Sequence, residues 1–88
     1  MTNEELIVSF EREFFTGSYS ESTIKTDLAY RRTLGAGKLE EKRKIYFQDF
    51  DLVLTHIDRI LREDTALISR CERCKNQVNR LSDIVRGF

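Results

Sequence analysis

The second half of the chain carries a stripe of apolar residues at helical spacing. From Tyr46 to Phe88 an apolar residue recurs every three or four positions, with one polar exception, Asp64. The spacing alternates between four and three, and this 3.5-residue period is typical of a helix that packs against other helices. The members of the stripe are Tyr46, Phe50, Val53, Ile57, Ile60, Asp64, Leu67, Cys71, Cys74, Val78, Leu81, Val85 and Phe88.

As far as Arg86, the region of the stripe contains neither of the two residues that most often end a helix. Neither glycine nor proline occurs from Lys38 to Arg86. The phase of the stripe is also unbroken, which favours one continuous helix of about 70 Å at 1.5 Å per residue. The alternative is a break near residues 62–65, with Asp64 as the cap of a fourth helix.

A shorter helix is predicted at the start of the chain. Thr2 and Glu5 stand at the spacing of a capping box, in which each side chain accepts a hydrogen bond from the other's backbone. Apolar residues then follow at helical spacing as far as Thr16-Gly17, where glycine permits the left-handed conformation that ends many helices.

A second short helix is predicted between that point and the long helix. Ser18 or Ser20 caps it, and it ends at the Gly-Ala-Gly break over residues 35–37. The chain is therefore predicted to be a single all-α domain over residues 1–88. Residues 1–34 form a two-helix head, and residues 38–88 form a long heptad-patterned helix for helical-bundle or coiled-coil association.

The stripe narrows along its length, which predicts different neighbours for its two halves. The positions beside it are apolar in the first half and polar in the second, and a broad stripe contacts more helices than a narrow one. We therefore expect residues 46–68 to pack on the amino-terminal helices and on a third surface. Residues 70–88 are expected to remain uncovered within one chain. The apolar flanking residues are Phe47, Leu54, Leu61 and Ile68, and the polar ones are Lys75 and Ser82.

An uncovered seam predicts association with a second copy or with a helix of a larger protein, because an isolated amphipathic helix is marginal in water. Residues 47–69 carry five acids against two Arg, and residues 70–88 carry five bases against two acids. An antiparallel homodimer pairs these opposite charges, whereas a parallel one opposes like charges. The antiparallel pair also places Asp64 near Arg70 of the second copy. The predicted seam comprises Leu67, Cys71, Cys74, Val78, Leu81, Val85 and Phe88, with Asp64 and Arg70 as its polar contacts.

Composition and charge exclude several other classes of protein. The chain has 88 residues, no proline or tryptophan, and 15 Lys or Arg against 15 Asp or Glu. The net charge of zero provides no overall attraction to nucleic acid or to an anionic membrane. The acidic amino terminus does not have the pattern of a secretory signal, and no apolar run approaches the roughly 20 residues that span a bilayer. We therefore expect a cytoplasmic protein with reduced thiols.

No motif for catalysis or cofactor binding accompanies the stripe. Cys71 and Cys74 form a C-E-R-C sequence with the spacing of redox and zinc motifs, but both fall on the stripe. We therefore interpret them as small apolar residues of a core. A zinc site needs about four ligands, and only a distant His56 stands beside the two cysteines. We predict no catalytic residue, no cofactor and no metal site, and hence a protein that is not an enzyme.

The alternative function is nucleic-acid binding. The first two helices and the turn over residues 16–20 have the general build of a helix-turn-helix. The stretch SESTIKTDL, from Ser20 to Leu28, resembles the start of the recognition helix in winged-helix repressors. It is also similar to the second helix of the core-binding domain of tyrosine recombinases. The resemblance implies one group of residues that faces bases and another that contacts phosphates. The first group is Ser20, Ser22, Thr23, Lys25 and Thr26, and the second is Tyr30, Arg31, Arg32, Lys38, Lys42, Arg43 and Lys44.

The basic block can also serve within the chain. Residues 22–46 carry seven Lys or Arg against three acids, and they follow an acidic block, residues 1–21, with five Glu against Arg12. Blocks of opposite charge attract when helices lie side by side. We therefore favour a small regulatory protein that acts by helix-on-helix docking, with a DNA-binding regulator as the alternative.

Overall fold

A computed structural model describes all 88 residues, and every regular element in it is helical. Helix α1 (Asn3–Glu11) continues into a π-helical turn, η1 (Arg12–Thr16). It is followed by α2 (Glu21–Leu34) and by the long helix α3 (Ala36–Glu63). A 3-10 turn, η2 (Thr65–Leu67), leads into α4 (Ile68–Arg86). The prediction of an all-α chain is confirmed, with four helices in place of three.

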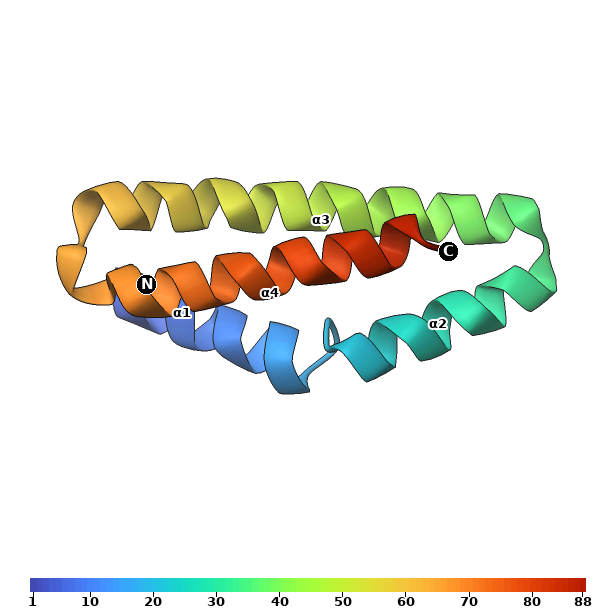
Figure 1. Ribbon diagram of the computed structural model, residues 1–88, viewed down its shortest axis with the longest axis horizontal. Helices are drawn as coiled ribbons and strands as arrows, with labels where there is room; N and C mark the ends of the chain where they lie inside the picture. The colour runs from blue at the N-terminus through green and yellow to red at the C-terminus, as the bar shows by residue number, and fades with distance from the viewer.

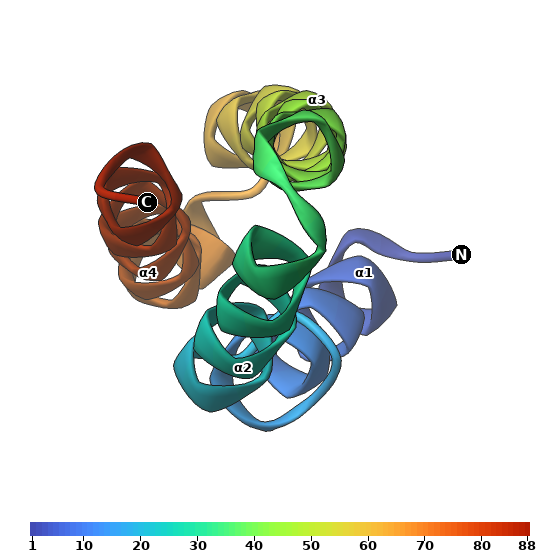
Figure 2. The ribbon, with the colours of Figure 1, turned by 90° about the vertical axis from the view of Figure 1, so that its right-hand side faces the viewer.

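The helices form a bundle of three legs, in which α3 is antiparallel to the other two (Figure 1). Figure 1 shows α1 and α2 end to end in the first leg, α3 returning along both, and α4 running back beside α3. Seen along its length in Figure 2, the bundle places the three legs at the corners of a triangle. The molecule measures 45 × 21 × 20 Å, so its long axis is close to the length of α3 alone.

The predicted signals at the helix ends are present in part: the first helix ends at Thr16 as expected, but Gly17 has φ of −99° and does not adopt the predicted left-handed conformation. Thr2 Oγ1 accepts a hydrogen bond from the Glu5 amide at 3.1 Å, and Glu5 Oε1 accepts one from the Thr2 amide at 3.1 Å. Ser20 occupies the N-cap position of α2, but its side chain forms no capping hydrogen bond. Gly35 alone forms the break between α2 and α3, with φ of 126°, and α3 already includes Gly37. The capping box is therefore confirmed, and the break is narrower than the one predicted over residues 35–37.

The prediction of one continuous helix from residue 38 to residue 86 is wrong. α3 ends at Glu63, and Asp64 has an extended backbone with φ of −138° and ψ of 92°. The Asp64 carboxylate accepts a hydrogen bond from the Ala66 amide at 3.2 Å, which caps the turn before α4. The alternative prediction, a break near residues 62–65 with Asp64 as a cap, is confirmed.

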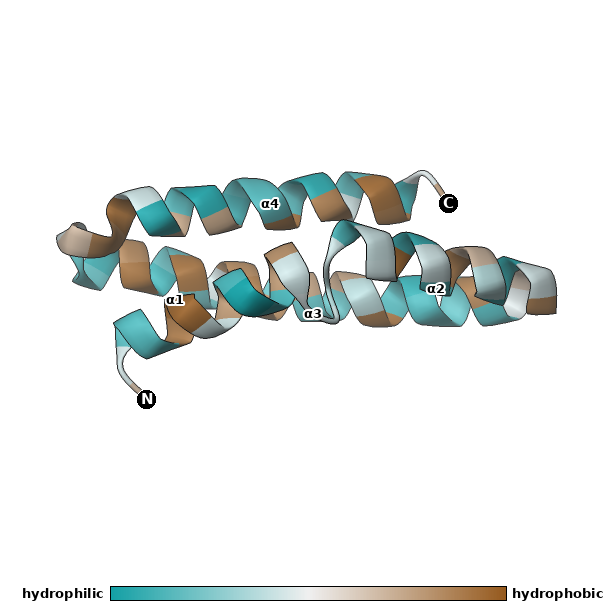
Figure 3. Ribbon diagram, turned by 90° about the horizontal axis from the view of Figure 1, so that it is seen from below, coloured by the Kyte–Doolittle hydropathy of each residue, from teal (hydrophilic) through white to brown (hydrophobic).

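The break folds the second half of the stripe back onto the first. α4 packs against α3, α1 and α2, so apolar residues from all three legs meet along the axis of the bundle. In Figure 3 the hydrophobic segments of α4 lie on the side that faces the other helices. The core has two clusters. One contains Phe14, Ile24, Leu28, Tyr46, Phe50, Val78, Leu81 and Val85, and the other contains Ile7, Ile57, Ile60, Leu67, Cys71 and Cys74.

This folding overturns the expectation that residues 70–88 remain uncovered within one chain. Leu67 is 7% exposed, and the other seam residues of α4 are completely buried. Phe88 is half-buried against the first cluster. The third surface expected beside residues 46–68 is therefore α4 of the same chain. The buried seam residues of α4 are Cys71, Cys74, Val78, Leu81 and Val85.

Candidate interaction surface

The two polar residues of the predicted seam have partners inside the chain. Arg70 donates hydrogen bonds to the Glu11 carboxylate at 2.6 and 3.1 Å, and Glu4 lies 3.6 Å from the same guanidinium. Asp64 caps η2. The predicted contact between Asp64 and Arg70 of a second copy therefore loses its basis, because each group already has a partner in its own chain.

The outward face of α4 offers little apolar surface. Ile68, at 38% exposed, is its one exposed large apolar side chain. A shallow hollow on this side, beside Phe15, is lined otherwise by polar and charged residues of α4. α4 therefore lacks the apolar anchors that would hold a partner helix.

The two cysteines lie in the second core cluster, as the stripe predicts. Both are free and completely buried. Burial raises the pKa of the Cys74 thiol to about 11, and the negative charge of Glu11 contributes in the same direction. Burial also raises the pKa of Cys71. No group of three or more His, Cys, Asp or Glu side chains in the structure could hold a metal ion. His56 is exposed beside α1, with its ring 6.3 Å from that of Phe10.

The first two helices do not have the arrangement expected of a helix-turn-helix. In that motif the two helices pack at about 90–120° to each other. Here α1 and α2 follow one another along the same leg and pack on α3 and α4 (Figure 1). Several of the residues implied to face bases are nevertheless exposed on α2, namely Ser22, Thr23, Lys25 and Thr26, while Ser20 is buried and bonds Thr23 at 2.9 Å.

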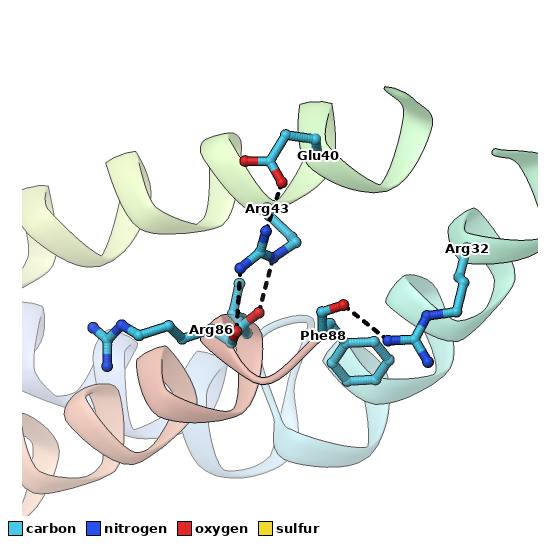
Figure 4. A network of polar contacts seen from close by, with 6 residues as sticks. Arg32, Glu40, Arg43, Arg86 and Phe88 are labelled. Atoms are coloured by element: carbon cyan, nitrogen blue, oxygen red, sulfur yellow. Dashed lines mark hydrogen bonds and ion pairs between the residues drawn. The ribbon is translucent and has the colours of Figure 1, made fainter. Parts of the chain in front are cut away.

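Two of the predicted phosphate-binding arginines hold the end of α4 (Figure 4). Arg43 donates to the carbonyl oxygens of Val85 at 3.0 Å and Arg86 at 3.2 Å. Arg32 donates to the carbonyl oxygen of Phe88 at 2.9 Å, and its guanidinium lies 4.9 Å from the Phe88 ring centre. The Val85 carbonyl also accepts from the Phe88 amide at 3.2 Å. The partial negative charge of the carbonyls at the end of a helix favours a cation.

Most other cations of the basic block also have partners inside the chain. Arg31 bonds Asp27 at 2.9 Å, and Lys25 bonds Glu21 at 3.2 Å. Lys42 lies 5.0 Å from the centre of the Tyr46 ring, whose hydroxyl donates to Asp27 at 2.7 Å. These contacts agree with the interpretation that the basic block serves within the chain. Lys38 and Lys44 have no ion-pair partner.

The structure shows an apolar seam on the outer face of α3 that the sequence pattern did not reveal. Leu52 is 63% exposed and Ile45 is 42% exposed, and these two residues are one heptad apart. Neutral Gln48 and Thr55, also exposed, continue the same row with spacings of three and four residues. We call the row of Ile45, Gln48, Leu52 and Thr55 the outer seam.

Leu52 also forms one edge of a groove between α1 and α3. Phe10, Tyr19 and Val53 contribute apolar surface to this groove, and Glu13 and Asp49 are its acidic members. The Tyr19 hydroxyl donates a hydrogen bond to the Asp49 carboxylate. The outer seam and this groove are continuous through Leu52, and we take them together as the candidate site.

The charges that flank the outer seam on its two sides change sign along α3. Lys42 and Lys44 flank its first half, and Asp49 and Asp51 flank its second half, while the exposed Glu41 precedes Ile45 by one turn in the row itself. Lys44 and Asp51 are both exposed and have no ion-pair partner in the chain. The surface therefore combines apolar anchors with a direction set by charge.

Comparison of the chain with protein-family models, curated proteins and solved structures finds no match in any of the three. None of the four helices has the length and hydropathy needed to cross a membrane. The function must therefore be argued from the candidate site itself.

Proposed function

We propose that this chain is a small non-enzymatic interaction protein that binds a helix along the outer seam of α3. The observation that carries the proposal is the exposure of Ile45 and Leu52, one heptad apart, on a helix whose opposite face is already packed in the core. Docking through α3 replaces docking through the C-terminal helix, because the α4 seam is buried inside the bundle. The cytoplasmic location expected from the sequence belongs to the same proposal.

The binding mode is helix-on-helix packing. An exposed helix that presents apolar residues one heptad apart accepts the apolar stripe of a second helix between them. Covering a leucine side chain that was in water contributes up to about 1.5–3 kcal/mol. The partner helix in turn would carry cations opposite Asp49 and Asp51 and acids opposite Lys42 and Lys44. Complementary charge then selects the partner and its direction.

Site-directed photo-crosslinking tests this proposal. A photoreactive amino acid at Gln48, in the middle of the outer seam, is expected to yield a discrete adduct in an extract of the source cells. The same group at Asn76, on the outward face of α4, is the matched control and should yield none. Leu52→Lys in the Gln48-labelled chain should abolish the adduct, because a charge replaces the apolar anchor.

Two outcomes would contradict the proposal. One is the absence of any adduct from position 48 when the bundle is shown by circular dichroism to be folded. The other is an adduct that Leu52→Lys leaves unchanged, because the crosslinked contact would then not depend on the seam.

Nucleic-acid binding by α2 is the second candidate function. Its support is the exposure of Ser22, Thr23 and Thr26 on one face of α2, with Tyr30 63% exposed one turn further along. Together with the unpaired Lys38, these residues would form a small contact surface for the phosphate backbone. Binding of a labelled duplex should then fall steeply between about 50 and 200 mM salt, because each phosphate contact releases counterions. No retention at the lowest salt would exclude this candidate.

A further inference from the structure

We infer that the helix bound by the outer seam is α3 of a second copy of this chain, in an antiparallel pair with two-fold symmetry. This inference rests on the proposed function and names its partner. It moves the site of self-association from α4, where the sequence placed it, to the opposite side of the bundle.

The positions of Lys44 and Asp51 carry the inference. They are seven residues apart, so they project from the same side of α3 and lie about 10 Å from each other along the helix. This separation is too large for an ion pair within the chain, and neither residue has another ionic partner. When two copies of α3 run in opposite directions, Lys44 of each copy can face Asp51 of the other, and both unpaired charges are satisfied at once.

A second pair of charges follows the same rule on the other side of the seam. Lys42 and Asp49 are also seven residues apart and also opposite in sign. The two-fold axis that pairs each lysine with the other copy's aspartate passes between Ile45 and Gln48. In a parallel pair the Lys44 side of one helix faces the Asp49 side of the other, which leaves Asp51 without a cation, so only the antiparallel arrangement satisfies both unpaired charges.

Ile45 lies next to this axis, where it faces Gln48 of the other copy. Leu52 lies one heptad further along on each side, where it faces Glu41 of the other copy. A two-fold axis brings the same surface of both copies together, which is the commonest form of soluble oligomer. The buried seam of α4 and the two arginines at its end are not involved, so each subunit keeps its own core.

Sedimentation equilibrium of the purified chain tests the inference. A single pair of helices belongs to the small class of interfaces, below about 1,200 Å² of buried surface, so we expect a reversible dimer at roughly 0.1–1 mM protein. Leu52→Glu, which places a second carboxylate against Glu41 of the other copy, should leave only monomer over this range. Asn79→Glu, which adds the same charge to the exposed face of α4, is the control and should dimerise like the natural chain.

Reversal of the paired charges provides the sharper measurement. Lys44→Asp or Asp51→Lys alone places like charges together at two symmetric positions, and each should raise the dissociation constant about tenfold. The double variant Lys44→Asp/Asp51→Lys restores opposite charges across the axis and should restore the natural dissociation constant. Both residues are exposed, so neither change should affect folding.

The outcomes separate this inference from the proposed function. A natural chain that stays monomeric at 1 mM, or a double variant no tighter than the single ones, overturns the two-fold pair. If the Gln48 crosslink then yields an adduct with a different protein, the helix-binding function stands and the identity of the partner is wrong. If there is neither a dimer nor an adduct, both fail.

Discussion

The guanidinium of Arg70 in α4 forms two hydrogen bonds with the carboxylate of Glu11 at the end of α1, at 2.6 and 3.1 Å. A fork-to-fork contact of this kind fixes orientation as well as distance. α1 has only nine residues and buries Ile7 in the core, so it depends on contacts of this kind with its neighbours. The pair therefore holds the first turns of the chain against the start of α4.

Removing the charge of Glu11 tests the contribution of this pair. The hydrogen bond from Arg70 lowers the pKa of Glu11 below its ordinary value of 4.5. The stabilisation is therefore present above about pH 4.5, the pKa of Glu11 in the unfolded chain. It is lost as the pH falls through the lower pKa that Glu11 has in the folded chain. Glu11→Gln should reduce the free energy of unfolding at pH 7 by about 0.5–1 kcal/mol, as measured by urea denaturation. Below the pKa of Glu11 in the folded state, the variant and the natural chain should converge.

Glu72→Gln is the control for this measurement, because Glu72 is exposed on the outward face of α4 and has no ion-pair partner. It should change the stability little at either pH. Equal effects of the two substitutions at pH 7 would mean that the loss reflects net charge and not the contact with Arg70.

The cap at Asp64 is expected to stabilise the turn between α3 and α4. Asp64→Ala removes the acceptor for the Ala66 amide and should cost about 1 kcal/mol. Asp64→Asn keeps an oxygen in the same position and should lose much less. Hydrogen exchange at the Ala66 amide, followed in all three chains, measures the effect locally. Faster exchange in the Asn variant than in the Ala variant would argue against the cap.

Gly35 and Gly37 should respond to alanine in opposite directions. Gly35 has φ of 126° and ψ of 158°, a conformation that is nearly restricted to glycine. No atom lies within 4 Å of the place where a Cβ would stand, so the strain of Gly35→Ala comes from the backbone and should cost about 1–3 kcal/mol. Gly37 lies inside α3 in equally open space, and Gly37→Ala should gain up to about 1 kcal/mol. Thermal unfolding of both variants tests the pair, and a loss at position 37 as large as at position 35 would contradict this reasoning.

The apolar stripe predicted the core correctly but could not reveal the turn within it. Ile60 and Leu67 are one heptad apart in the sequence, and they point to the same core cluster from α3 and from the turn before α4. An antiparallel pair of helices around a shared core has the same periodicity as one long helix. The phase of the stripe therefore does not distinguish the two arrangements. The local signal was the acidic residue at 64, which is a common cap.

The error about the α4 seam followed directly from the missed turn. With one long helix, residues 70–88 extend beyond the two amino-terminal helices, and nothing in the chain can cover them. With a turn at Asp64, the same residues lie between α3 and the first leg. The contacts of Arg32 and Arg43 with the end of α4 depend on where that end lies, so the sequence could not predict them either.

The outer seam was missed for a different reason. Ile45 and Leu52 stand singly among charged residues, and isolated apolar residues on a surface are common. Their separation of seven residues was visible in the sequence. It became informative only when the structure assigned the opposite face of α3 to the core.

Cys74 should make the stability of the bundle sensitive to alkaline pH. Burial raises the pKa of its thiol from the ordinary 9.0 to about 11, so the folded state holds its proton longer than the unfolded state does. The stabilisation is present below about pH 9 and is lost as the pH rises towards 11. Cys74→Ala should cost about 1–2 kcal/mol at pH 7, because it leaves a small void in the second core cluster. It should also reduce the further loss of stability between pH 9 and pH 11, as measured by urea denaturation at both values.

Labelling with a thiol reagent at pH 8 checks the burial of the two cysteines directly. Both should react only as fast as the bundle opens, because neither thiol is accessible in the folded chain. Immediate reaction of two thiols in the folded chain would contradict the packing.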